Sequence, residues 1–194
     1  MSASPEAAPA AEALPGVAAL AERFDGFIVD QWGVLHDGSR PYPGALDCLE
    51  RLRAAGKGIV VLSNSGRRED ANVRLMEEMG FPARLFDRVV SAGEDAREAI
   101  ATRATPFHAR LGRRCHAFTR AGDRSILEGI GIDFVEAVGE ADFLAAIGID
   151  SPRRNLPDYE EELRAGVARG LPMICANPDI SRFHGGRQIG RAHV

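Results

Sequence analysis

The stretch FIVDQWGVLHDG at residues 27–38 decides the fold, because a short apolar run ends there in an aspartate followed by a glycine-containing turn. A second apolar run, IVVLS at residues 59–63, ends in a serine. Neither run alternates with polar residues, which is typical of parallel strands covered by helices on both faces. The sequence therefore predicts an α/β fold.

Helical segments lie between and after these two runs. Residues 44–55 follow Pro43 and stop at Gly56, while residues 69–79 stop at Gly80. Proline before a helix and glycine after it are the usual start and stop signals. The order strand, helix, strand, helix predicts a βαβ unit with parallel strands.

A composition change near residues 91–93 predicts a second α/β module at about residues 92–175. Within it we expect helices at 94–102, 123–129 and 156–170, a connection at 106–112, and strands at 115–118, 132–135, 142–147 and 173–176.

Composition and charge exclude several classes of protein. The 194 residues include 24 Lys and Arg against 28 Asp and Glu, a formal charge of −4 that does not favour nucleic acid as a partner. No apolar run approaches the roughly 20 residues of a membrane helix. Residues 1–15 form an Ala- and Pro-rich stretch without the basic start of a secretory signal, so we expect a flexible tail.

The three cysteines are Cys48, Cys115 and Cys175, and their odd number and wide spacing suggest neither a disulfide framework nor a metal knuckle. This usage predicts a reducing, cytoplasmic compartment. Nothing in the composition marks an interface, so the sequence leaves the oligomeric state open.

Two polar residues end the two apolar runs. Asp30 and Ser63 are 33 residues apart, about one βαβ unit, and a right-handed crossover brings both to the carboxyl edge of neighbouring strands. An ionised aspartate can attack phosphorus and form an acyl phosphate. The Ser63 hydroxyl and the Asn64 backbone N–H are expected to hold the phosphoryl oxygens, aided by a helix that starts near Arg67.

Four motifs together resemble the haloacid dehalogenase (HAD) superfamily, specifically its IIA subclass of NagD-like hydrolases: FIVDQWGVLHDG at 27–38, PGA at 43–45, IVVLSNSGR at 59–67 and ICANPD at 174–179. The resemblance implies a Rossmann-like HAD core with an inserted α/β cap domain, and Mg²⁺-dependent hydrolysis of phosphate monoesters. It implies a first part of the core at residues 16–91, the cap at 92–175 and a return to the core at 176–188.

The resemblance also implies roles for particular residues. Asp30 corresponds to the nucleophile and, with the backbone carbonyl of Trp32, to a metal ligand. Ser63 and Asn64 correspond to the phosphate-binding second motif, and residues 177–179 to the return from cap to core. Arg67 could attract an anionic substrate or simply belong to an exposed helix face.

One departure from the family pattern lies two residues after the nucleophile. A second aspartate normally stands there, protonates the leaving group and then activates water, but this chain has Trp32. An indole does neither, and loss of a general acid or base costs about 10²- to 10⁴-fold in rate. Asp37 could stand in as the acid or be an ordinary turn residue, and Trp32 could pack over the substrate or anchor the core.

The other departure concerns the carboxyl end. The family's third motif, a lysine, and its fourth, a Gly-Asp pair that holds Mg²⁺, are expected beyond Asp179 and do not occur there. We therefore expect a carboxyl-terminally truncated, incomplete core that is not a competent phosphatase as written. Residues 189–194 (IGRAHV), with Gln188, can be encoded by a common sequencing adapter, so we expect non-native read-through; the alternative is a natural short form.

Three functions follow as hypotheses. The first is a HAD-type hydrolase of small phosphorylated metabolites, such as a sugar phosphate or nucleotide, working through an aspartyl-phosphate intermediate with Mg²⁺. The second is a HAD-like protein that binds phosphate esters or has a regulatory role without turnover. The third is a dehalogenase whose nucleophile attacks carbon, against which the NagD-like cap pattern argues.

Overall fold

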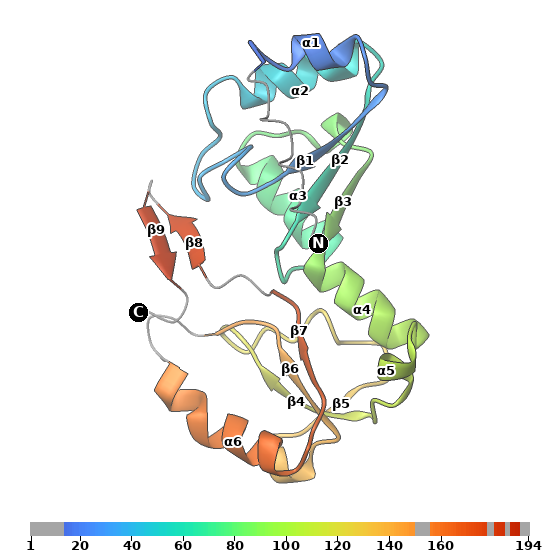
Figure 1. Ribbon diagram of the computed structural model, residues 1–194, viewed down its shortest axis with the longest axis vertical. Helices are drawn as coiled ribbons and strands as arrows, with labels where there is room; N and C mark the ends of the chain where they lie inside the picture. The colour runs from blue at the N-terminus through green and yellow to red at the C-terminus, as the bar shows by residue number, and fades with distance from the viewer. Residues whose placement is uncertain (1–13, 150–155, 178–180, 185–186, 191–194) are drawn as a thin grey trace, which may run out of the picture.

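The chain is described by a computed structural model that covers residues 14–149, 156–177, 181–184 and 187–190. Most of the expected tail, residues 150–155, Asp179 and residues 191–194 lie outside the described residues. Two parallel sheets lie one beyond the other along the long axis, and helix α4 leads from the first to the second (Figure 1). The α/β class is confirmed.

The first sheet has the order β1-β2-β3, with all strands parallel. Its strands are β1 (Gly26–Asp30), β2 (Gly58–Ser63) and β3 (Arg88–Ser91). The helices of this unit are α1 (Ala18–Ala21), α2 (Ala45–Ala54), α3 (Glu69–Glu78) and the 3₁₀ helix η1 (Ala83–Leu85). β1, β2, α2 and α3 lie where the sequence predicts them.

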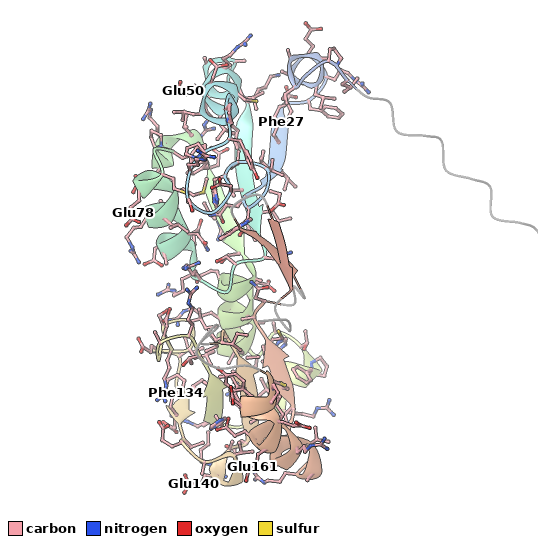
Figure 2. The ribbon with its side chains drawn as sticks, turned by 90° about the vertical axis from the view of Figure 1, so that its left-hand side faces the viewer. Phe27, Glu50, Glu78, Phe134, Glu140 and Glu161 are labelled. Atoms are coloured by element: carbon pink, nitrogen blue, oxygen red, sulfur yellow. The ribbon has the colours of Figure 1, made fainter. Side chains whose placement is uncertain are left out.

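One face of the first sheet packs into a hydrophobic core. Ile59 and Val61 are fully buried there with Phe81, and α2 and α3 contribute Leu49 and Met76. Burying such side chains contributes about 1.5–3 kcal/mol each. Figure 2 shows Phe27 on β1, with Glu50 on α2 and Glu78 on α3 in the same unit.

The other face of this sheet differs from the prediction. Ile28 is 75% exposed and Leu62 is 50% exposed, so the described residues do not cover both faces as the apolar runs predicted. A continuous apolar strand is typical of a sheet whose two faces are both covered. The pattern does not say which residues cover each face.

The second sheet has the order β5-β4-β6-β7 and is also parallel. Its strands are β4 (Arg114–Phe118), β5 (Asp133–Phe134), β6 (Phe143–Ala146) and β7 (Met173–Cys175). Its helices are α4 (Ala92–Thr102), α5 (Pro106–Ala109), α6 (Glu160–Ala168) and the 3₁₀ helices η2 (Val138–Glu140) and η3 (Leu156–Tyr159). Phe134, Glu140 and Glu161 mark this unit in Figure 2.

Several elements of the sequence prediction are wrong. Residues 123–129, expected to be a helix, form turns, and the Asp123 carboxylate accepts a hydrogen bond from the Ser125 N–H at 3.0 Å. Strand β3 was not predicted. The strands β8 (Ser181–His184) and β9 (Arg187–Gly190) form an antiparallel pair, which was not predicted either.

Smaller differences concern two other segments. The expected connection at 106–112 contains the short helix α5, and the helix expected at 156–170 begins as the 3₁₀ helix η3 before α6. The three cysteines are unpaired, with Cys115 buried and Cys175 exposed. In the part of the chain that the structure describes, no helix has the length and apolar character needed to cross a bilayer.

Asp142 fastens the start of β4 and gives a pH-dependent prediction. Its carboxylate accepts hydrogen bonds from the Arg114 side chain at 2.7 Å and from the backbone N–H groups of Arg114 and Arg113 at 2.9 and 3.1 Å. These bonds lower the pKa of Asp142 from 3.8 to about 2. Because the folded pKa is depressed, this stabilisation is complete above the unfolded pKa and is lost as the pH falls from about 4 to about 2.

We expect Asp142→Asn to lower the free energy of unfolding by about 1 kcal/mol at neutral pH. The deficit relative to the unaltered chain should shrink as urea titrations move from about pH 5 to about pH 3. Asp47→Asn is the matched control, since that carboxylate makes only an exposed 3.8 Å pair with Arg51. A deficit that stays constant with pH contradicts this account.

Candidate functional site

Asp30 is the last residue of β1, at the carboxyl edge of the first sheet. It is exposed, and its Oδ1 accepts a hydrogen bond from the Gln31 N–H at 2.8 Å. In register it pairs with Leu62 of β2. A carboxylate at this edge lies where open α/β sheets place their ligands.

Ser63 is the last residue of β2 and lies one position beyond the partner of Asp30. The two residues therefore share one edge of the sheet. Ser63 is buried, and its Oγ accepts the Ser65 N–H at 3.2 Å. Because side chains alternate along a strand, Asp30 leaves β1 on the face of Leu62, whereas Ser63 leaves β2 on the other face. A ligand can meet both groups only beyond the strand ends.

The loop after Asp30 is held by its own backbone. The Gly33 N–H donates to the His36 carbonyl at 2.8 Å, and the Leu35 N–H donates to the Gln31 carbonyl at 3.0 Å. The Gly38 N–H donates to His36 Nδ1 at 3.0 Å. These hydrogen bonds give the loop a defined turn conformation.

Trp32 lies against this turn. Gly38 has a φ of +95°, and a Cβ atom there would lie 2.3 Å from the indole Cζ2 of Trp32. The Trp32 and His36 rings meet edge to face, with centroids 5.6 Å apart. Glycine is thus needed at position 38 both for the backbone conformation and for the indole.

The side chains of His36 and Asp37 are both engaged in contacts within the loop. Burial lowers the pKa of His36, whose ring is fully buried, although the charges of Asp37 and Asp30 oppose this. Asp37 Oδ1 accepts the Ser39 and Arg40 N–H groups at 2.9 and 3.0 Å. These bonds lower the pKa of Asp37, so the structure favours the turn role over the acid role for this residue.

The loop after Ser63, residues 64–68, is the second loop at this edge of the sheet, and the start of α4 anchors it. Ser91 Oγ donates to the Arg67 carbonyl at 2.7 Å and accepts the Glu94 N–H at 3.2 Å. Asn72 Nδ2 donates to the carbonyls of Arg67 and Arg68 at 3.2 and 3.0 Å. The sequence prediction missed Ser91 and Glu94, although their Ser-x-x-Glu spacing is the signal of a capping box.

Two glycines let the second loop lie close to the segments that connect the two sheets. A Cβ atom on Gly93 would meet the Gly66 carbonyl oxygen at 2.4 Å, and one on Gly66 would meet the Ile147 carbonyl oxygen at 2.9 Å. The Asn177 Cβ lies 3.9 Å from that same Gly66 position. The loop after Ser63 is therefore packed where the chain passes between the two units.

The helix expected near Arg67 begins two residues later. α3 starts at Glu69, and the Glu94 carboxylate accepts the Glu69 N–H at 2.9 Å. That helix terminus is thus already bonded to an acidic side chain, which corrects the expectation that it opens toward a phosphoryl group. Arg67 is exposed, and its guanidinium forms no ion pair with a described residue.

Oxygen donors for a metal ion are few at this edge. The Asp30 carboxylate and the Trp32 carbonyl are hard oxygen donors of the kind Mg²⁺ prefers. The described residues contain no group of three His, Cys, Asp or Glu side chains that could hold a metal ion. One carboxylate and one carbonyl therefore form only part of a metal site.

A surface pocket of about 590 Å³ lies elsewhere, on the second unit. It is lined by residues of η3 and α6: Pro157, Glu160, Leu163, Arg164, Val167 and Ala168. None of the residues predicted for catalysis lines it.

The anchoring of the second loop gives a prediction. Ser91→Ala removes a helix cap and a bond to the Arg67 carbonyl, so we expect the free energy of unfolding to fall by about 1 kcal/mol. Amide hydrogens of residues 64–68 should exchange faster, measured by mass spectrometry. Ser91→Thr keeps the hydroxyl and is the control. Unchanged exchange at residues 64–68 in Ser91→Ala would show that this bond does not hold the loop.

Comparison with known proteins places this geometry among its relatives. The sequence model of haloacid dehalogenase-like hydrolases matches residues 27–133. A 4-nitrophenylphosphatase from Schizosaccharomyces pombe is 37% identical over 76 residues, which cover 39% of this chain and 26% of the relative. A haloacid dehalogenase-like hydrolase from Brucella suis 1330 is 34% identical, with a TM-score of 0.81 over 92% of this chain and 64% of that one.

A third relative shows likeness of fold alone. A glycerol phosphate phosphatase from Mycobacterium tuberculosis, solved in complex with magnesium, is 20% identical, with a TM-score of 0.65 over 89% of this chain and 50% of that one.

The matched region is more than half of the chain and contains Asp30, Ser63, Asn64 and Arg67. The chain spans about a quarter of the curated phosphatase and less than two thirds of the Brucella hydrolase. With the match over residues 27–133 and the shared parallel-sheet architecture, the chain belongs to the family of haloacid dehalogenase-like hydrolases and has their Rossmann-like α/β fold.

Proposed function

We propose that this chain carries the nucleophile of a hydrolase that acts on small phosphate monoesters. The observation that carries the proposal is the placement of Asp30 and Ser63 at the ends of adjacent parallel strands, on one edge of the sheet. The relative from Schizosaccharomyces pombe is named a 4-nitrophenylphosphatase, which supports phosphate esters as substrates.

In the proposed reaction the Asp30 carboxylate attacks phosphorus and forms an aspartyl phosphate, and the leaving group departs with the electron pair of its P–O bond. Water then attacks the same phosphorus and releases phosphate, which restores the carboxylate. The Ser63 hydroxyl and the Asn64 N–H stabilise the phosphoryl oxygens, and Arg67 attracts the anionic substrate from solvent. The anchored second loop keeps these donors in place before substrate binds.

The cofactor and the layout of the whole protein stay proposals as well. We propose Mg²⁺, with Asp30 and the Trp32 carbonyl as two of its ligands; when bound, such an ion neutralises phosphoryl charge. We also propose that residues 16–91 belong to the core, residues 92–175 to a cap and residues 176–188 to the return. The unpaired cysteines agree with the proposed cytoplasmic location.

A second candidate is a protein of this fold that binds phosphate esters without hydrolysing them. Trp32 favours it, because its indole replaces a proton-carrying group and is fixed against Gly38. This candidate keeps Ser63, Asn64 and Arg67 as the anion-binding residues but assigns no turnover to Asp30.

The two candidates are separated by phosphate release from 4-nitrophenyl phosphate in the presence of Mg²⁺. The assay uses the product of the longest natural reading frame that contains these residues, with the 194-residue chain in parallel. Our proposal predicts phosphate release that depends on Mg²⁺ and on Asp30. Saturable binding of the ester without phosphate release from either protein favours the binding candidate and contradicts hydrolysis.

A further inference from the structure

The loop after Asp30 has two side chains that can exchange a proton in the ordinary pH range, and both are engaged. Asp37 accepts hydrogen bonds from the Ser39 and Arg40 N–H groups on Oδ1, and from the Arg40 Nε on Oδ2 at 3.4 Å. These are the contacts of an ionised carboxylate within a turn. Among residues 31–40, which the structure describes in full, only His36 is a further candidate.

His36 is shielded from any leaving group. Its ring is fully buried, and Nδ1 accepts the Gly38 N–H at 3.0 Å, so the neutral ring carries its proton on Nε2. Nε2 has no hydrogen-bond partner among the described residues. A donor buried this way helps to shape the turn but does not reach solvent to be reprotonated.

Trp32 belongs to the same turn, and its side chain is held in place by its neighbours. Its indole lies so close to Gly38 that a Cβ atom at position 38 would approach it to 2.3 Å, and its ring also meets the His36 ring edge to face. An indole N–H does not transfer its proton in neutral water. Among residues 31–40, the loop beside the nucleophile thus presents no side chain with a proton available to a leaving group.

We infer that this site takes phosphate monoesters of acidic hydroxyl groups, of which aryl phosphates are the simplest, because their leaving groups depart without being protonated. The inference rests on the proposed function. Asp30 forms a bond to phosphorus while the P–O bond to the leaving group breaks, and that oxygen keeps the electron pair as an aryloxide. Water then gives its oxygen to phosphorus and one proton to the buffer, and the Asp30–phosphorus bond breaks to return the carboxylate.

The lack of a general acid among residues 31–40 sets the size of the preference for acidic leaving groups. A positioned general acid accelerates departure of a basic leaving group by about 10²- to 10⁴-fold, and it adds little for a leaving group that is already a stable anion. The site should therefore hydrolyse 4-nitrophenyl phosphate faster than phenyl phosphate, and phenyl phosphate faster than an alkyl phosphate, with a steep dependence on the leaving-group pKa.

The test measures kcat/KM for 4-nitrophenyl, phenyl and ethyl phosphate with the same reading-frame product. Trp32→Asp places a carboxyl group in the turn and should raise the ratio of kcat/KM for ethyl phosphate to kcat/KM for 4-nitrophenyl phosphate by about 10²-fold. Trp32→Phe keeps a ring without an acid and should keep the steep dependence. Asp37→Asn keeps the turn acceptor and should also leave the dependence unchanged.

The rates of the unaltered protein with the three esters test the inference even if Trp32→Asp fails to fold. A flat dependence on leaving-group pKa in the unaltered protein shows that an acid operates, and it overturns the inference while leaving the proposed function intact. Loss of ethyl phosphate hydrolysis in Asp37→Asn overturns it too, by identifying Asp37 as that acid. If no ester is hydrolysed, the proposed function fails and this inference fails with it.

Discussion

Replacing Asp30 with asparagine should lower kcat for 4-nitrophenyl phosphate by about 10⁴-fold or more. An amide oxygen is a poor nucleophile toward phosphorus, so what remains is the contribution of binding and of electrostatic stabilisation. The side chain is exposed at the end of β1, and it accepts one hydrogen bond from the Gln31 N–H. Asparagine keeps an acceptor for that bond, so the fold should be retained.

Asp37→Asn is the matched control for this variant. It makes the same chemical change seven positions away in the same loop, at a carboxylate that caps the Ser39 and Arg40 N–H groups. Its rate should stay within the same order of magnitude as that of the unaltered protein. Equal rates for Asp30→Asn and the unaltered protein would remove Asp30 from the mechanism.

Gly93→Ala should be the most destabilising of the substitutions considered for the fold. Its Cβ atom would lie 2.4 Å from the Gly66 carbonyl oxygen and 2.7 Å from the Arg67 carbonyl oxygen. Both contacts are with backbone, which cannot rotate away as a side chain can. Overpacking of this kind costs about 1–3 kcal/mol, or ~2–12 °C in the melting temperature of a chain of this size.

The same substitution should weaken binding of inorganic phosphate, because the displaced backbone belongs to the loop that carries Asn64 and Arg67. Gly139→Ala is the control, since no atom lies within 4 Å of its added methyl group and its φ is not positive. Thermal melts and phosphate titrations by calorimetry check both effects. A Gly93→Ala protein that melts with the control and binds phosphate equally would show that the close approach of Gly93 to Gly66 has no energetic consequence.

The sequence predicted the first sheet well where apolar runs were long. β1 and β2 each contain at least three consecutive apolar residues, and their spacing correctly placed Asp30 and Ser63 on one edge. β3 was missed because Arg88 and Ser91 flank only two apolar residues, and its pairing with β2 supplies what local propensity does not.

The second unit and the support of the site were harder to predict. Residues 123–129 were expected to form a helix, but they form turns, and the Asp123 carboxylate accepts the Ser125 N–H in a local bond that competes with helix formation. The bonds of Ser91 to Arg67 and of Glu94 to Glu69 join segments more than 20 positions apart. Such contacts depend on the folded arrangement, so a motif can indicate which residue performs chemistry but not what holds it in place.

The central claim is that Asp30 becomes covalently phosphorylated, and trapping that intermediate tests it most directly. The protein is mixed with 4-nitrophenyl phosphate, quenched in acid and reduced with borohydride, which converts an aspartyl phosphate to homoserine. Peptide mass spectrometry should then find homoserine at position 30 and unmodified aspartate at position 37. Phosphate release with no modification at Asp30, or with the phosphoryl group on Ser63, would contradict the account.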